Sequence, residues 1–140
     1  MELQFEQLRQ QDIIQLRDIS DEFADINPYD VKSFLADKRN IALVAKLHSK
    51  VVGLLYGYSL TDFDGATAQF YVYSVDIHTD YQNQGYGSKF VQFAIEWAKG
   101  NGFRACCVYA DEYNPRACHV YKKVGMTAIN AKEFTIQFSE

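Results

Sequence analysis

The sequence predicts a mixed α/β fold, an α+β arrangement in which a central mixed sheet is flanked by helices. Residues 41–77 contain three apolar or aromatic segments in succession, separated by short polar turns, as in strands that pair with their chain neighbours. The residues that follow alternate between helical and strand patterns, which is typical of β-α-β units. Because 140 residues is the size of one domain, we expect a single domain over residues 1–140.

The N-terminal residues are expected to form a short strand and two helices before the first long strand. Residues 1–5 fit the strand, and the apolar residues between 12 and 23 recur near one face of a helix. Asn27 and Pro28 interrupt this pattern, and Asp30 is a suitable cap for a second short helix. Three strands follow, at residues 41–47, 51–60 and 68–77.

The second half of the chain is expected to alternate helix and strand. A long helix over residues 86–101 places its aromatic residues on one face, and a strand follows at 105–109. The last helix has clear ends, because Asn114 is a good N-cap and Pro115 suits the first helical position. Residues 134–138 alternate between apolar and polar and predict a final strand. The resulting element order is β-α-α-β-β-β-α-β-α-β.

The composition excludes several classes of protein. Hydrophobic residues make up 48% of the chain and aromatic residues 15%, which excludes a disordered protein. The net charge of −4 and the absence of a Lys/Arg cluster argue against a nucleic-acid partner. No apolar run approaches the ~18 residues of a membrane span, so no membrane association is expected.

The cysteine and histidine residues predict neither disulfides nor a metal site. Three cysteines with no C-x-x-C pair suggest a reduced compartment, and we expect a cytoplasmic protein. The three histidines are scattered without ligand spacing, so no metal is expected. Cys118 and His119 are neighbours on a helix, where adjacent side chains do not face each other, which argues against a thiol–imidazole pair.

The segment from Gln82 to Ser88 is the strongest candidate for a binding site. It follows a strand, contains Gly85 and Gly87, and opens the long helix, where backbone N–H groups are unpaired. Glycines allow close approach of a ligand, and the helix dipole favours a negative group such as a diphosphate. An ordinary strand-to-helix turn is the alternative. The P-loop motif is absent, and a dinucleotide fingerprint would need glycine where Phe90 stands.

The spacing around this segment resembles the GNAT-type acyl-CoA N-acetyltransferases. The strand end Val75-Asp76-Ile77 is followed by Gln82-x-x-Gly85-x-Gly87, and a second motif lies in residues 114–126. The resemblance covers residues 68–127, is weaker over 41–60 and rests on element order over 1–40. It implies acetyl-CoA as co-substrate, held between the parting strands 68–77 and 105–109. The residues that it assigns to acetyl-CoA binding are Val75, Asp76, Ile77, Gln82, Asn83, Gln84, Gly85, Tyr86, Gly87, Ser88 and Asn114.

The resemblance also implies a direct attack of an amine on the thioester. Tyr121 stands where the family commonly carries the acid that protonates the leaving thiolate, although core packing is an alternative role. Asp111, at the end of a strand, is the candidate base, with Glu112, Tyr73 and a water chain left open.

Two features bear on the acceptor amine. Residues 71–73 and 110–111 look like those of small aminoglycoside 3-N-acetyltransferases, but residues 114–115 are Asn-Pro where those enzymes have further acidic residues. The segment 18–31 has five acidic residues and no Lys or Arg, which favours a small cationic amine over a nucleic acid. A solvated acidic surface is the alternative.

Other functions remain open from the sequence. They are a non-enzymatic acyl-CoA-binding or sensing module, an acetyltransferase acting on a protein amine, and a binder of nucleotide phosphates. A homodimer is also left open.

Overall fold

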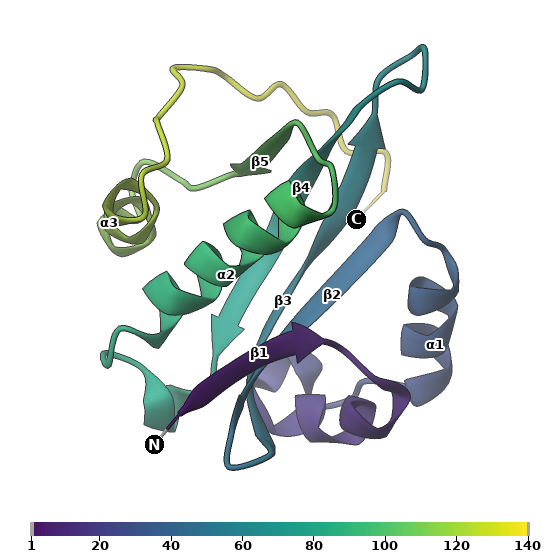
Figure 1. Cartoon of the computed structure of the whole chain (residues 1–140), viewed down its shortest axis with the longest axis vertical. Coiled ribbons are helices and arrows are strands. Elements are labelled where there is room, and N and C mark those ends of the chain that lie inside the picture. Colours follow the sequence, from purple (N-terminus) through teal and green to yellow (C-terminus); the bar gives the residue numbers. More distant parts are fainter. Residues whose placement is uncertain (1, 140) are drawn as a thin grey trace.

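The sheet is built around three antiparallel strands, β2 (Asn40–Leu47), β3 (Lys50–Thr61) and β4 (Ala68–Ile77). β1 (Leu3–Gln7) pairs antiparallel with β2, and β5 (Ala105–Val108) pairs parallel with β4, which gives the order β1-β2-β3-β4-β5. The mixed sheet expected from the sequence is therefore confirmed. This computed structural model describes residues 2–139, so Met1 of the expected first strand lies outside the described residues (Figure 1).

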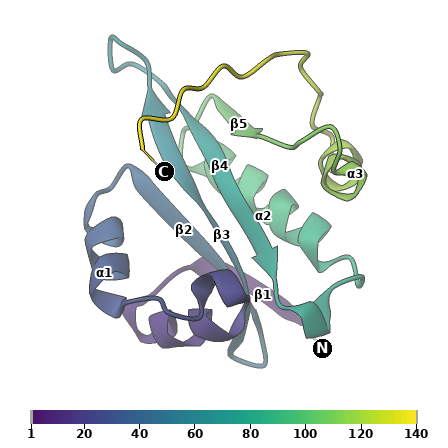
Figure 2. The same ribbon diagram turned by 180° about the vertical axis from the view of Figure 1, so that it is seen from behind.

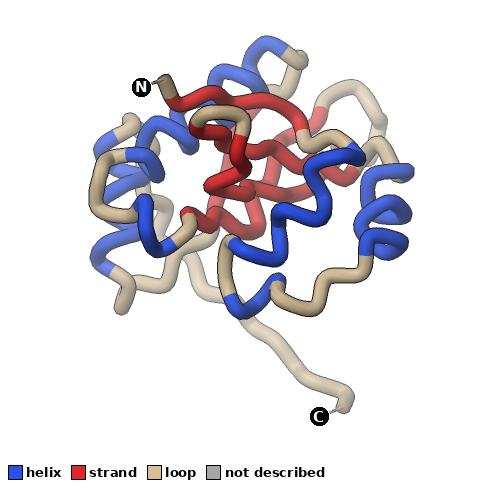
Figure 3. The backbone as a smooth tube through the Cα atoms, turned by 90° about the horizontal axis from the view of Figure 1, so that it is seen from below, coloured by secondary structure: helices blue, strands red, loops and turns tan. Residues whose placement is uncertain are grey.

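Helices cover both faces of the sheet. α2 (Tyr86–Gly100) packs on one face, and α3 (Pro115–Lys123) lies beside it. The opposite face carries α1 (Pro28–Ala36) and two 3₁₀ helices, η1 (Gln10–Asp18) and η2 (Asp21–Phe23). A short 3₁₀ turn, η3 (Thr79–Tyr81), joins β4 to α2. Figures 1 and 2 show the two faces, and Figure 3 shows the strands in the middle with helices around them. None of the helices in residues 2–139 is both long and apolar enough to cross a membrane.

Each face of the sheet has its own apolar core. Under α2, Phe70 of β4 and Phe90 of α2 are fully buried with Leu55 of β3. On the other face, Ile13 and Leu16 of η1 pack against Val44 of β2 and its neighbours. Directly paired residues of adjacent strands lie on the same face, so the register assigns each strand residue to one core or the other.

The segment expected to form one helix over residues 12–23 is instead two 3₁₀ helices. Its buried residues Ile13, Leu16 and Ile19 are spaced by three, and each is at most 2% exposed. A 3₁₀ helix has three residues per turn, so this spacing aligns all three on the sheet, whereas an α-helix would rotate them apart. The expectation of an α-helix was wrong because spacings of three and four were treated as equivalent.

The cap of α1 also differs from the expectation. Asn27 is the N-cap, and its Oδ1 accepts a hydrogen bond of 2.8 Å from the Tyr29 N–H. Pro28 therefore occupies the first helical position rather than ending a structure, and Asp30 lies within the first turn. The corresponding expectation for α3 is confirmed, since Asn114 is its N-cap.

The final strand expected at residues 134–138 is not formed. These residues are loop, and Phe134 and Phe138 are 91% and 93% exposed. Alternation makes one apolar face, but a strand also needs a partner backbone, and the register assigns the partners of β5 to β4 alone. The apolar alternation is thus present without the pairing.

A buried ion group ties the N-terminal segment to the sheet. Asp12 of η1 is 2% exposed, and its Oδ1 lies 2.9 Å from Nζ of Lys46 on β2. Lys46 Nζ also lies 2.5 Å from Oε1 of Glu6 on β1, and the hydrogen bond to Glu6 is the main reason that the Lys46 pKa is raised. The second Asp12 oxygen accepts the Arg9 N–H at 3.0 Å. The charges are therefore paired where they are buried.

Candidate functional site

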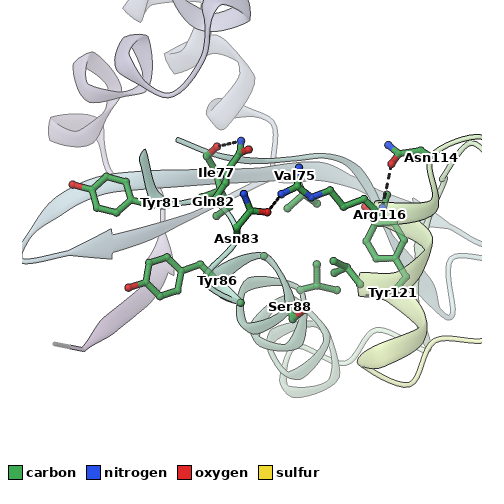
Figure 4. A pocket seen from close by; sticks show the side chains of 15 residues that line it. Val75, Ile77, Tyr81, Gln82, Asn83, Tyr86, Ser88, Asn114, Arg116 and Tyr121 are labelled. Carbon is green, nitrogen blue, oxygen red and sulfur yellow. Dashed lines mark hydrogen bonds between the residues drawn. The ribbon is translucent and has the colours of Figure 1, made fainter. Parts of the chain in front are cut away.

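A cavity of about 410 Å³ lies between the end of β4, the start of α2 and one face of α3 (Figure 4). Nine of the eleven residues expected to bind acetyl-CoA line it, and so does Tyr121. The nine are Val75, Ile77, Gln82, Asn83, Gly85, Tyr86, Gly87, Ser88 and Asn114. The fold therefore brings the two sequence motifs together on one cavity.

The cavity opens where β4 and β5 part. The two parallel strands pair only from Gln69–Ala105 to Val72–Val108, while β4 continues to Ile77. Beyond Val72 this side of β4 has no strand partner in the described chain, although β3 still pairs with its other side. An extended, amide-containing ligand can therefore hydrogen-bond to β4 there as a short strand would.

Gly85 gives the loop before α2 its shape. It is the N-cap residue of α2 with φ of 80°, a left-handed conformation that glycine adopts without strain. A Cβ built on Gly85 would meet no atom within 4 Å, so the loop is open on that side. The first N–H groups of a helix have no intrahelical acceptor, and here they border the cavity. Gln82 fixes the loop to β4, because its Nε2 donates to the Ile77 carbonyl at 2.8 Å.

α3 closes the other side of the cavity. The Asn114 Oδ1 accepts a hydrogen bond of 3.2 Å from the Ala117 N–H, which begins the helix. Arg116 lines the cavity and donates from its guanidinium to Oδ1 of Asn83, which links α3 to the glycine loop (Figure 4). The helix starts of α2 and α3 therefore face the same cavity from two sides.

Arg116 is a site residue that the sequence reasoning missed. A signal was present, because a cation in the first turn of a helix opposes the helix dipole and is disfavoured there without another partner. In the structure the guanidinium adds a positive charge to a cavity already bordered by N–H donors. This combination suits a phosphate or diphosphate group.

Tyr121 presents a protonated phenol to the cavity. Burial raises the pKa of Tyr121 above its ordinary value of 10, and the nearby Cys118 and Asp76 raise it further. The hydroxyl therefore keeps its proton at neutral pH and can donate it. The thiol of Cys118 lies 3.6 Å from the Asp111 carbonyl oxygen and serves the packing of α3.

Asp76, Gln84 and Asp111 do not line the cavity. Asp76 is paired with Leu54, so it lies on the opposite face of the sheet, where it accepts a hydrogen bond of 2.8 Å from Ser74 Oγ. Gln84 is exposed, and its amide reaches the Asp80 carbonyl at 3.5 Å. The exposed Asp111 carboxylate accepts the N–H of Tyr113 at 2.9 Å and so shapes the turn before α3.

The acidic segment 18–31 lies on the face of the sheet opposite α2. It includes η2 and the start of α1, which pack with Tyr56 of β3 around the core on that face. The charge of Glu22 raises the pKa of Tyr56, as does that of Asp76, although burial is the larger cause. Glu22 of the acidic segment and Asp76 of β4 therefore both lie close enough to Tyr56 to act on its pKa.

Comparison with known proteins agrees with this geometry. The model of the acetyltransferase (GNAT) family matches residues 6–126. A probable N-acetyltransferase, camello, of Xenopus tropicalis is 28% identical over 94 residues, which is 67% of this chain and 42% of that protein. The chain therefore spans less than half the length of this curated relative.

Solved structures show the same fold at low identity. One is an aminoglycoside acetyltransferase from an uncultured soil metagenomic sample, in complex with sisomicin. It superposes with a TM-score of 0.84 at 24% identity, and the match covers 99% of this chain and 97% of that chain. A ribosomal-protein-alanine N-acetyltransferase from Brucella melitensis biovar Abortus 2308 superposes with a TM-score of 0.79 at 16% identity, and the match covers 98% of this chain and 100% of that chain. An aminoglycoside N-acetyltransferase in complex with CoA superposes with a TM-score of 0.81 at 10% identity, and the match covers 99% of this chain and 96% of that chain.

Proposed function

The chain belongs to the acetyltransferase (GNAT) family, and we propose that residues 1–140 form one N-acetyltransferase domain that moves the acetyl group of acetyl-CoA to a primary amine of a small cationic molecule. The observation that carries the proposal is one cavity lined by the glycine loop (residues 82–88), the unpaired side of β4 and the phenol of Tyr121. Both reactants would be held together, because the amine attacks the thioester directly in a ternary complex.

The residues around the cavity suit the chemical groups of CoA. The N–H groups at the start of α2 and the Arg116 guanidinium would hold the diphosphate, since both are donors without acceptor capacity. The backbone of Val75 and Ile77 would pair with the amide-containing pantetheine arm along the unpaired side of β4. Asn114 would contact the same arm from α3. Acetyl-CoA supplies an activated acyl group, a thioester that an uncharged amine can attack.

Two side chains are proposed for proton transfer. Asp111 would take the proton that an ammonium must lose before its nitrogen bonds to the acyl carbon. Its carboxylate accepts one turn hydrogen bond, from the Tyr113 N–H, and is exposed to solvent for a second. As the carbon–sulfur bond breaks, Tyr121 would donate its phenolic proton to the departing sulfur, because its raised pKa keeps that proton in place until then.

The acidic segment supports a cationic acceptor. Five carboxylates without a Lys or Arg in residues 18–31 raise the local concentration of a cation and lower that of an anion. The neighbours in complex with sisomicin and with CoA are aminoglycoside acetyltransferases, which agrees with a small polar amine. The Brucella neighbour, named for a ribosomal protein, supports the alternative of a protein amine. A test of the proposal therefore includes both acceptors.

The test is acetyl transfer by the purified chain. Acetyl-CoA is mixed with a panel of small amines and with a peptide bearing a free α-amino group, and thiol release is followed together with the mass of the acetylated product. We expect a small amine to gain an acetyl group. Binding of CoA with no product from any acceptor would instead indicate a non-enzymatic acyl-CoA-binding module. If ATP competed with CoA for binding to the chain and desulfo-CoA did not, the chain would instead be a binder of nucleotide phosphates.

A further inference from the structure

Two neighbouring groups of contacting aromatic rings lie on the outward side of β3 and β4, on the sheet face opposite α2. We call them together the tyrosine surface, and its members are Phe34 of α1, Tyr56 and Tyr58 of β3, Tyr71 and Tyr73 of β4, and Tyr109 after β5. The ring centroids of the contacting pairs are 5.7–6.0 Å apart. Rings at this separation attract one another, and each therefore restricts the orientation of its partner.

Tyr73 is the most exposed ring at the centre of the tyrosine surface. Its ring lies 5.7 Å from that of Tyr56 and 5.8 Å from that of Tyr58, yet the residue is 63% exposed. The β3–β4 register shifts at this position, because Tyr56 pairs with Ser74 while Gly57 pairs with Val72. The bulge is stable only with glycine at 57, since a Cβ there would overlap the Tyr71 carbonyl. A bulge of this kind changes the direction of a side chain, here that of Tyr73.

The surroundings of the tyrosine surface are negatively charged. The pKa of Tyr56 is raised first by burial, and then by Tyr58, Glu22, Tyr73 and Asp76. Two of these groups, Glu22 and Asp76, are carboxylates that carry a negative charge at neutral pH. An aromatic face beside carboxylates attracts a positive group both through the ring quadrupole and through Coulomb attraction.

The tyrosine surface also borders the opening between β4 and β5. Val72 is the last β4 residue paired with β5, so Tyr73 is the first residue beyond the point where the strands part. Asp76, further along the same outward side, acts on the pKa of Tyr121 across this opening. A molecule on Tyr73 therefore lies beside the route from the outward face of β4 to the cavity that Tyr121 lines.

We propose that the tyrosine surface is the acceptor site and that it selects a primary amine carried on a ring, with the ring stacked on Tyr73 and the ammonium group directed toward Asp76. This inference rests on the proposed acetyl transfer and adds the class of acceptor to it. Both an aromatic ring and the C–H face of a sugar ring can stack on a tyrosine, so the shared requirement is a flat ring face. A linear alkylamine offers the same ammonium group without this face.

The test compares three amines at saturating acetyl-CoA. Phenethylamine carries an aromatic ring, glucosamine carries a sugar ring, and n-octylamine has as many carbon atoms as phenethylamine but no ring. We expect kcat/KM to be higher for at least one ring amine than for n-octylamine. The ring amine that reacts faster identifies which kind of ring the surface takes.

Two variants connect the preference to Tyr73. Tyr73→Leu should lower kcat/KM for the ring amine about tenfold more than that for n-octylamine, because only the ring amine loses a stacking contact. Tyr73→Phe keeps the ring and should keep the parent's preference for the ring amine over n-octylamine. Phe63→Leu is the matched control, since Phe63 lies in the β3–β4 turn, is fully exposed and belongs to no ring pair of the tyrosine surface.

The outcomes separate this inference from the function on which it rests. Equal losses for ring and linear amines in Tyr73→Leu, or no loss at all, would overturn the tyrosine surface as acceptor site while acetyl transfer stands. A parent that prefers n-octylamine would overturn it in the same way. If the parent acetylates no amine although it binds CoA, the proposed function itself fails. An Asp76→Asn variant should raise KM for the ring amine and not for acetyl-CoA, and an unchanged KM for the amine would remove Asp76 from the site.

Discussion

Replacing Gly85 with valine separates the role of the loop in ligand binding from its role in folding. Gly85 has φ of 80° and Gly65, in the β3–β4 turn, has φ of 73°. A Cβ at either position would meet no atom within 4 Å, so valine is strained at both but collides with nothing at either. A left-handed conformation costs a non-glycine residue about 1–2 kcal/mol. Gly85→Val and Gly65→Val should therefore lower Tm by similar amounts, on the order of 5 °C.

Only Gly85→Val should weaken CoA binding. Its side chain would occupy the open space through which a diphosphate reaches the N–H groups at the start of α2. A hydrogen bond to a charged group contributes about 1.5–3 kcal/mol. Loss of two such bonds costs about 3–6 kcal/mol, which is a rise in Kd of about 10²–10⁴-fold.

Isothermal titration with CoA measures this difference, and thermal unfolding followed by circular dichroism measures the strain. The Gly65→Val variant supplies the same backbone strain far from the cavity, so its Kd should equal that of the parent. If the two valine variants bound CoA equally well, the glycine loop would not be the diphosphate site. A loss of affinity in both would show that strain alone weakens binding.

Three further predictions concern the acid, the acceptor side and the buried ion group. Tyr121→Phe should lower single-turnover acetyl transfer about 10²–10⁴-fold with little change in CoA affinity. Only the parent should lose kcat as the pH rises above 10, because the raised pKa of Tyr121 keeps its phenol protonated below that pH. Unchanged acetyl transfer in the variant would mean that Tyr121 is a packing residue. Changing Asp21, Glu22 and Asp25 together to Asn, Gln and Asn should raise KM for the amine about tenfold at low salt and leave KM for acetyl-CoA constant. An unchanged KM for the amine would mean that the acidic segment is ordinary solvated surface. Lys46→Met leaves a buried carboxylate without its ammonium partner and should lower the free energy of unfolding by about 3–5 kcal/mol in urea titrations, whereas a loss below about 1 kcal/mol would mean that solvent already screens the group.

The sequence predicted the elements whose local signals agree with their tertiary partners. The strand at 68–77 and the start of α2 lie where the pattern placed them, and the Asn114 cap forms the expected hydrogen bond. The strand expected at 134–138 is absent because pairing depends on another backbone, which no pattern within those residues describes. The 3₁₀ form of η1 depends on the spacing of Ile13, Leu16 and Ile19 against the sheet.

The candidate site was predictable where it consists of backbone and not where it depends on side-chain direction. The glycine loop and the β4 end line one cavity, as their motifs indicated. Asp76 lies between two residues that line that cavity but points to the other face, because neighbouring residues of a strand alternate. Arg116 reaches the loop through a long side chain from another helix, which spacing along the chain does not reveal.

The most direct test of the central claim is to locate CoA on the protein in solution. Backbone amide signals of the isotope-labelled chain are followed by NMR as CoA is added. The amides of Gly85, Gly87 and Ser88 should shift most, together with those of Val75 and Ile77 on β4, and the amide of Gly65 should not move. A second cavity, lined by Leu8, Asn40 and Ser59 among others, lies at the other end of the sheet. Shifts centred on that cavity, or no shifts at saturating CoA, would contradict the assignment of the site.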